Sequence, residues 1–156
     1  MTIAKETTED SGFQFTARHL ALILVVIGLV ISGYLSYVKL LDVPIICVEG
    51  EQFSCTAVES SKWSTFQGIP VAYLGFAGYL FIGAVLLLEK RIAFLEDNGR
   101  LILFIIALFG WMYSMWLVYV QAVIILAFCQ WCLAHEFNFT ILFGVILYML
   151  WQDLRG

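Results

Sequence analysis

The sequence predicts an all-α integral membrane protein, a bundle of four transmembrane helices with one large outward loop at about residues 39–68. Two observations predict this class. The 156 residues are 62% hydrophobic and 13% charged, whereas soluble domains are about 45–50% apolar and about a quarter charged. The apolar residues also form four long runs, and a membrane span needs about 20 such residues to cross roughly 30 Å of hydrocarbon.

The four runs are expected to be helices, because a chain in lipid must satisfy its own backbone hydrogen bonds. The first run is too long for the core of a signal peptide and no small-residue cleavage site follows it, so it is expected to remain as a helix. The last residues of the third run are expected to lie beyond the hydrocarbon. The spans are placed at about residues 20–38, 69–88, 101–128 and 133–151.

The polar residues before the first span, 1–17, predict a disordered cytoplasmic arm, and residues 18–156 predict one membrane domain. The net charge of -4 is small, and no basic stripe follows the chain. The expected surroundings are therefore membrane lipid, and no nucleic-acid partner is expected.

Basic residues divide unevenly between the two sides of the predicted bundle. The side with the termini and the 89–100 loop holds six, and the side with the 39–68 loop holds two. Because basic residues are retained on the cytoplasmic side, both termini are expected in the cytoplasm. The six are Lys5, Arg18, Lys90, Arg91, Arg100 and Arg155, and the two are Lys39 and Lys62.

All four cysteines of the sequence then fall on the outer side. Cys47 and Cys55 lie in the outward loop, and Cys129 and Cys132 lie at the outer end of the third span. Disulfides persist on that side of a membrane and are rare in the reducing cytosol. Since the orientation came from charge alone, the shared position of the cysteines is independent support for a function that uses them.

Three interpretations of the two cysteine pairs are open. They could be structural disulfides that tie the loop to the bundle. They could supply four thiolates to a structural zinc site, although thiols on an oxidising face tend to be lost to disulfides, so no metal is expected. They could form a redox relay, because a Cys-x-x-Cys dithiol opens and closes readily.

A relay gives the two pairs different tasks. Cys132 is expected where the fourth helix begins, and the positive end of the helix dipole favours a thiolate there. Exchange requires direct attack of a thiolate on a sulfur, and a pair at the membrane interface is difficult for a soluble protein to reach. The loop pair, Cys47 and Cys55, can visit both places and is expected to act as the shuttle.

The order of the motifs is specific. The loop pair is followed by Ser60-Ser61-Lys62-Trp63, Gly68-Ile69-Pro70 opens the second span, and Cys129-Gln130-Trp131-Cys132 ends the third. Over nearly the whole chain, this order resembles the vitamin K epoxide reductase family, including its bacterial members that oxidise dithiols with membrane quinone.

The resemblance implies a four-helix bundle around a quinone (menaquinone, ubiquinone or phylloquinone of the vitamin K class), with the outer loop capping the active site. It implies that Cys132 lies next to the quinone, with Cys129 as its disulfide partner. Cys55 would exchange with Cys129, and Cys47 would complete the loop disulfide that faces the soluble thiol protein. Ser61 resembles the family's loop serine, a hydrogen-bonding group near the active cysteines.

Two features of this chain stand out within the resemblance. Several bacterial relatives carry a fused thioredoxin-like domain, and none follows here, so the partner is expected to be a separate thioredoxin-fold protein on the outer side. Some relatives carry a tyrosine four residues after the last cysteine, where it can bind the quinone oxygen. This chain has Glu136 there, which disfavours vitamin K epoxide chemistry and favours simple quinone reduction.

Other polar and aromatic residues are candidates for the cofactor site. His135 and Glu136 could manage protons, and an unperturbed histidine pKa of about 6.5 suits such a relay. Gln121 could hydrogen-bond a quinone carbonyl or link two helices. Trp63 and Trp131 are expected to contact the cofactor. Phe128 is a further candidate, within an aromatic belt typical of membrane proteins that includes Trp116 and Tyr119.

These expectations describe a membrane thiol oxidase that supports disulfide formation. Electrons would pass from the thioredoxin-fold partner through the loop pair and the Cys-x-x-Cys pair to a membrane quinone. One alternative is a reductase whose useful product is the quinol, as in vitamin K recycling. Another is a membrane scaffold with structural disulfides. The expected location is a bacterial-type plasma membrane.

Overall fold

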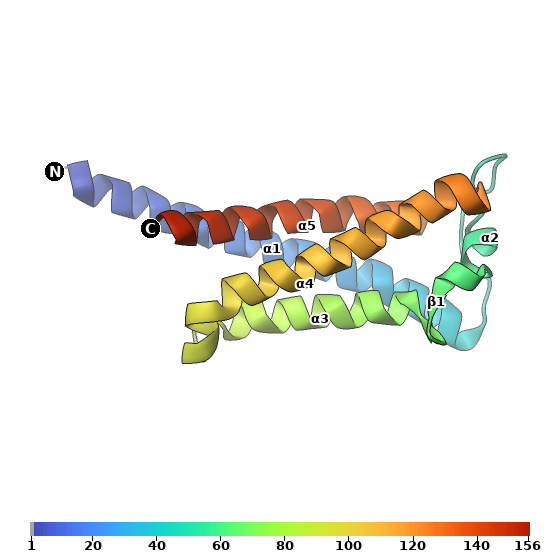
Figure 1. Ribbon diagram of the computed structural model, residues 1–156, viewed down its shortest axis with the longest axis horizontal. Helices are drawn as coiled ribbons and strands as arrows, with labels where there is room; N and C mark the ends of the chain where they lie inside the picture. The colour runs from blue at the N-terminus through green and yellow to red at the C-terminus, as the bar shows by residue number, and fades with distance from the viewer. Residues whose placement is uncertain (1) are drawn as a thin grey trace.

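The computed structural model describes residues 2–156, and most of them are helical (Figure 1). Four of the helices have the length and composition to cross a membrane, which confirms the predicted four-span bundle. In chain order the elements are α1 (Thr2–Leu41), α2 (Cys55–Glu59), η1 (Lys62–Ser64), β1 (Thr65–Phe66), β2 (Ile69–Pro70), α3 (Val71–Leu88), α4 (Ala93–Tyr119), η2 (Val120–Ile125) and α5 (Gln130–Arg155).

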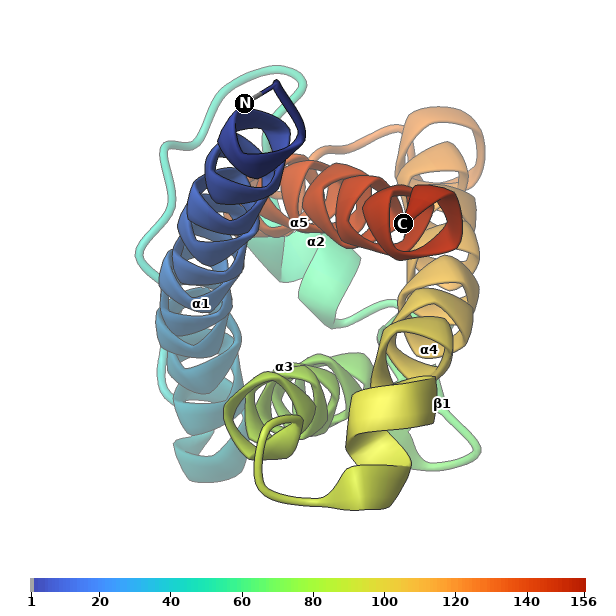
Figure 2. The same cartoon turned by 90° about the vertical axis from the view of Figure 1, so that its left-hand side faces the viewer.

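The four long helices form a ring, and the segment between α1 and α3 closes one end of it. Both termini and the α3–α4 connection lie at the opposite end (Figure 1). Seen along the bundle, the short helix α2 lies behind the centre of the ring (Figure 2). We call the end with α2 the cysteine end and the other the termini end.

The helices differ in length from the predicted spans. α1 begins at Thr2, so the structure differs from the disordered arm expected at residues 1–17. Residues 2–17 contain no proline, and a helix that has already formed adds further residues at one hydrogen bond each. α4 likewise begins at Ala93 instead of about residue 101, and α5 begins at Gln130 instead of about residue 133.

The third predicted span ends differently from a regular helix. α4 passes into η2, a π-helical turn, and Leu126 then adopts a left-handed φ of 58°. The Gln121 carbonyl accepts the N–H of Leu126 and also the N–H of Ala127, the latter at 3.2 Å. The chain therefore leaves the helix before residue 128 and approaches the first turn of α5 as an irregular strand.

The packing of α1 against α3 depends on a missing side chain. The ring of Tyr79 lies against Gly28, where an added Cβ would overlap the ring. Tyr79 is buried, and its hydroxyl accepts a hydrogen bond from Asn138 Nδ2 on α5 at 3.2 Å. Asn138 Nδ2 also donates to the carbonyl of Leu24 at 3.0 Å. These contacts join α1, α3 and α5 near the middle of the bundle.

A buried carboxylate joins the helices at the termini end. Glu89 is 5% exposed, and its two oxygens each lie 3.2 Å from an arginine Nε, one from Arg18 and the other from Arg100. Arg18 Nη2 also donates to the carbonyl of Leu86 at 2.7 Å, and Arg100 Nε lies 3.7 Å from Asp153. All four long helices therefore contribute to one ion-pair network.

Candidate functional site

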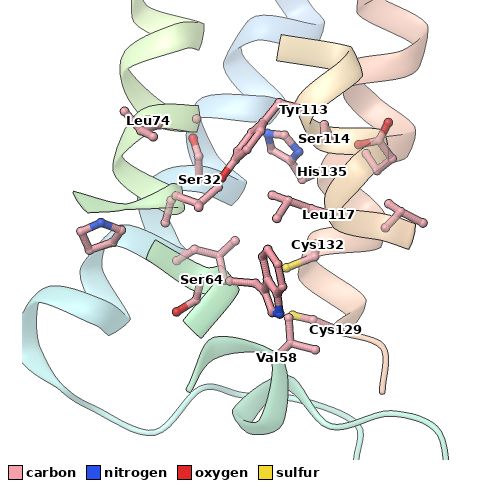
Figure 3. Close-up of a pocket in the computed structure, with 18 of the residues that line it drawn as sticks. Ser32, Val58, Ser64, Leu74, Tyr113, Ser114, Leu117, Cys129, Cys132 and His135 are labelled. Carbon is pink, nitrogen blue, oxygen red and sulfur yellow. The ribbon is translucent and has the colours of Figure 1, made fainter. Parts of the chain in front are cut away.

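A cavity of about 370 Å³ opens inside the cysteine end. All four long helices and the capping segment contribute to its wall (Figure 3). Most of the lining is apolar, and a few polar groups interrupt it. The polar lining residues include Ser32, Lys39, Glu59, Ser61, Tyr79, Tyr113, Ser114, Gln121, Cys129, Cys132, His135 and Glu136.

The loop cysteines form a disulfide that packs beside Val58 and Cys129 of the cavity wall. Cys47 and Cys55 are bonded, with their Cα atoms 6.2 Å apart. Cys55 is the first residue of α2, which begins there because Ser54 Oγ accepts the N–H of Ala57 at 3.3 Å. Cys55 is 1% exposed, whereas Cys47 is partly exposed. A thiol arriving from outside can therefore reach only the sulfur of Cys47.

The other two cysteines are free thiols in the cavity wall. Cys129 is buried and Cys132 is half-buried. Cys129 lies nearer to Val58 of the cap, and Cys132 lies deeper in the bundle (Figure 3). Cys55 and Cys129 belong to one buried cluster, with Cys47 and Cys132 packed against it. Tertiary structure therefore brings the two sequence-distant pairs together.

Cys129 occupies the position that favours a thiolate. It is the N-cap of α5, the residue that precedes the first helical turn. A hydrogen bond from the Cys132 thiol lowers the pKa of Cys129 to about 7, with help from the backbone N–H groups of Cys132 and Trp131, while burial opposes the change. The sequence had placed this thiolate at Cys132, because α5 was expected to begin later than it does.

Gln121 holds the backbone of Cys129. Its Oε1 accepts the Cys129 N–H at 3.0 Å, and the residue is 3% exposed. The side chain thus joins η2, at the end of the third span, to the N-cap of α5, so Gln121 does link two spans. Gln121 also lines the cavity, as expected for a cofactor contact.

Trp131 and Phe128 are not among the residues that line the cavity, and their contact with a cofactor stays a prediction. Trp131 Nε1 donates to the carbonyl of Ile46 in the loop at 2.7 Å. The backbone of Phe128 bonds to the loop as well, accepting from the Ser54 N–H at 3.0 Å and donating to the Gln52 carbonyl at 2.9 Å. Both residues are turned towards the cap because α4 ends before them.

Trp63 and Ser61 do lie in the cavity wall. The ring of Trp63 meets the ring of Trp116 edge-on, with centroids 6.3 Å apart. Ser61 Oγ donates to the carbonyl of Val58 at 2.7 Å, which leaves its oxygen able to accept. The cap therefore brings one large aromatic ring and one hydroxyl to the cavity.

His135 and Glu136 line the cavity from α5. The imidazole packs against Tyr79 and Phe139, with centroid distances of 5.4 and 5.8 Å. Glu136 is 7% exposed, and its Oε1 accepts the Thr140 hydroxyl at 3.2 Å. Its Oε2 is buried without a hydrogen-bond partner among the described residues. An orphaned polar atom beside a cavity is a place where a ligand can bind.

Several polar residues of the cavity wall were not assigned to the site from the sequence, and two of them, Tyr113 and Glu59, bear on its chemistry. Tyr113 points its ring into the cavity (Figure 3), but in the sequence it stands in an aromatic run that is typical of a membrane belt. Glu59 lines the cavity at the end of α2, where burial raises its pKa and nearby Lys39 opposes that rise. Its position in the polar loop indicated only exposure to water.

The disulfide divides the four cysteine sulfurs into a bonded pair and a free pair. Cys47 and Cys55 are joined in the disulfide, and Cys129 and Cys132 are thiols. Among residues 2–156, no group of three or more His, Cys, Asp or Glu side chains is placed to hold a metal ion. What the site offers instead is a disulfide beside a dithiol, with an apolar cavity behind them.

One comparison with known proteins bears on this arrangement. The family model described as the vitamin K epoxide reductase family matches residues 19–147, which is most of the chain. The match includes all four cysteines and every residue of the cavity wall.

Proposed function

The chain belongs to the vitamin K epoxide reductase family, and from that premise we propose that it is a membrane thiol oxidase which delivers electrons from a protein dithiol to a quinone. Family membership makes the protein a membrane oxidoreductase of quinone-linked type. The observation that carries the finer proposal is the shared position of Cys129 and Cys132 in the wall of an apolar cavity, with the loop disulfide packed over them.

The cavity suits a quinone ring. Its volume of about 370 Å³ falls in the range of about 300–1,000 Å³ typical of small-molecule sites. The wall is apolar apart from a few polar groups, among them the carboxyl group of Glu136 with its unpaired Oε2. When that carboxyl group is protonated, it can donate a hydrogen bond to a ring oxygen. The Tyr113 ring also points into this space. When bound, a quinone supplies an acceptor for two electrons and two protons.

The membrane pair then becomes a disulfide. Cys129 and Cys132 together lose two electrons and two protons, and the Cys129 thiolate forms the new bond to the Cys132 sulfur. Cys132 is the deeper of the two in the cavity (Figure 3), so its sulfur is assigned the place next to the ring. His135, Glu136 and Tyr113 are the cavity groups that can hold or pass the protons.

The loop pair resets the membrane pair. Reduction of the loop disulfide by an outside dithiol yields free Cys47 and Cys55. The Cys55 thiolate attacks the sulfur of Cys129, and Cys132 leaves as a thiolate. Cys47 then attacks Cys55, which restores the loop disulfide and frees Cys129. Each cycle moves two electrons and consumes no sulfur–sulfur bond overall.

The same proposal places the molecule in its membrane. Both termini lie in the cytoplasm and the cysteine end faces outward, supported by the excess of basic residues at the termini end. The dithiol partner is a thioredoxin-fold protein on the outer side, and the membrane is of the bacterial plasma type. A purely structural role is disfavoured because Cys129 and Cys132 are unpaired thiols.

The test is anaerobic reoxidation of the purified, dithiol-reduced protein by a short-chain quinone. We expect the wild type to lose its thiols with formation of an equal amount of quinol, and the Cys132→Ala variant to do neither. If wild-type thiols persist beside intact quinone, the oxidase proposal fails.

A further inference from the structure

The loop segment that carries Cys47 is fastened to the bundle by its backbone. The N–H of Ile46 donates to the hydroxyl of Tyr34 on α1 at 3.0 Å. The carbonyl of the same residue accepts from Trp131 Nε1 on α5 at 2.7 Å. The rings of Tyr34 and Trp131 pack against each other with centroids 4.6 Å apart. Both backbone groups of Ile46 therefore face the bundle.

Val48 is held in the same way. Its N–H donates to Gln130 Oε1 at 3.3 Å. The two middle residues of the Cys-x-x-Cys motif, Gln130 and Trp131, thus bind the residues on either side of Cys47. Ile46 and Val48 are 73% and 72% exposed, whereas Cys47 between them is partly buried. Exposure that alternates from one residue to the next is the pattern of an extended chain, because its successive side chains point to opposite faces.

This geometry leaves one edge of the segment free. In an extended chain the backbone groups of successive residues point to opposite edges. Because Ile46 and Val48 bond to the bundle, the N–H and carbonyl of Cys47 point away from it. Neither group has a hydrogen-bond partner within the part of the chain that the structure describes. A free edge of this kind is a template for pairing with another chain.

The surroundings of the free edge define the partner. The exposed Ile46 and Val48 side chains flank the only accessible sulfur of the disulfide. Residues 42–53 contain Asp42, Glu49 and Glu51 but no lysine or arginine. A complementary surface would carry a thiol, an apolar border around it and basic groups beyond.

We propose that residues 46–48 are a docking strand for the reduced thiol protein. An extended segment beside the partner's thiol pairs with the Cys47 N–H and carbonyl, and its apolar border covers Ile46 and Val48. This inference rests on the proposed function and names how that partner is recognised. The bundle holds the strand through Tyr34, Gln130 and Trp131, so Trp131 acts as a positioning residue.

The chemistry follows from the docking. The partner's thiolate attacks the sulfur of Cys47, the Cys47–Cys55 bond breaks, and Cys55 leaves as a thiolate next to Cys129. The partner's second thiol, as a thiolate, then attacks its own sulfur in the mixed disulfide and releases Cys47. The partner has lost two electrons and two protons, and the loop pair has become a dithiol.

The first test is amide exchange in the trapped complex. In the 156-residue chain, Cys55, Cys129 and Cys132 are changed to serine. Cys47 is then joined to a thioredoxin that retains only its attacking cysteine. Cysteine labelled with ¹⁵N reports the Cys47 amide alone. We expect its hydrogen exchange to slow by about tenfold or more relative to the same chain carrying cysteamine on Cys47. Equal rates in the two adducts would overturn the proposal.

The second test keeps all four cysteines. The ratio of kcat/KM for reduced thioredoxin to kcat/KM for dithiothreitol is measured with a short-chain quinone. Ile46→Glu should lower this ratio by about tenfold, because a charge replaces an apolar contact at the interface. Val43→Glu, an exposed residue of the same loop, should leave the ratio unchanged. An equal loss with both dithiols in Ile46→Glu would show that the side chain only supports the loop, and would overturn docking.

The two proposals fail in different ways. If dithiothreitol is oxidised by quinone while the Cys47 amide stays unprotected, docking fails and the oxidase stands. If neither dithiol is oxidised by the wild type, the oxidase itself fails.

Discussion

The two ends of the bundle are held together by different kinds of interaction. At the termini end, a buried carboxylate bridges two arginines and joins all four long helices. At the cysteine end, a cavity separates the helices, and the cap is held by hydrogen bonds from side chains and from the backbone of Phe128. A disulfide within the cap joins Cys47 to Cys55. One end thus has contacts that persist, and the other has bonds that a redox cycle can break. Stability concentrated at the first leaves the second free to change.

The largest expected effect is at the termini end. Glu89→Ala leaves Arg18 and Arg100 without their shared carboxylate, and breaking a buried ion pair costs about 3 kcal/mol. We expect the free energy of unfolding in detergent to fall by about that amount, while quinone-dependent oxidation per folded molecule stays the same. Glu96→Ala, at an exposed acid on the same side, is the matched control. Lost activity with unchanged stability would show that the two ends are coupled.

An effect of medium size is expected at the cysteine end, where a change of pH alters the thiolate fraction of Cys129. The pKa of Cys129 is lowered to about 7 by the hydrogen bond from Cys132. The thiolate is the deprotonated form, so its fraction rises with pH, by about tenfold between about pH 6 and about pH 8. Ultraviolet absorbance of the thiolate, in wild type minus Cys129→Ser, measures this rise.

The Cys132→Ala variant provides the control for that titration. It removes the largest cause of the lowered pKa, and the midpoint of the Cys129 titration should therefore move to higher pH. A midpoint that stays near 7 would assign the effect to the helix N-terminus alone.

The smallest effect concerns a single hydroxyl in the cavity. Tyr113→Phe removes one polar group from the wall, and a lost hydrogen bond of this kind costs about 1 kcal/mol. We expect the KM for a short-chain quinone to rise about fivefold, with kcat changed less. Tyr119→Phe, an exposed tyrosine of the same helix, should leave the KM as it is. If the two variants behave alike, Tyr113 does not bond the quinone.

Hydrophobic runs and cysteine spacing were enough to predict the bundle. The four spans follow from the lengths of the apolar runs, because the thickness of the lipid sets the length of a span. The position of the cysteines at one end follows from their order along the chain relative to those spans. The limits of the helices were less predictable. The early start of α5 at Gln130 depends on the π-helical turn and the left-handed Leu126 before it, and neither has a sequence signal.

The directions in which side chains point within the site could not be predicted from the sequence either. Trp131 lies between Cys129 and Cys132 in the sequence, yet its N–H is bonded to a loop carbonyl that is distant in sequence. Tyr113 resembles a membrane-belt tyrosine in sequence and points into the cavity in the structure. Each depends on a partner that only the tertiary fold supplies. Trp63 and Ser61, within the motif that follows the loop cysteines, do line the cavity.

The backbone pairing between the loop and residue 128 has a consequence for how such a chain can diverge. Ser54 and Gln52 reach Phe128 through main-chain atoms alone, and those atoms are the same whichever side chains they carry. Substitutions in this part of the loop can accumulate without moving Cys55 away from Cys129, so descendants could acquire new partners by point changes. An inserted or deleted residue between Gln52 and Cys55 would instead shift the pairing by one position. We therefore expect the length of this short stretch to persist in lineages where its composition drifts.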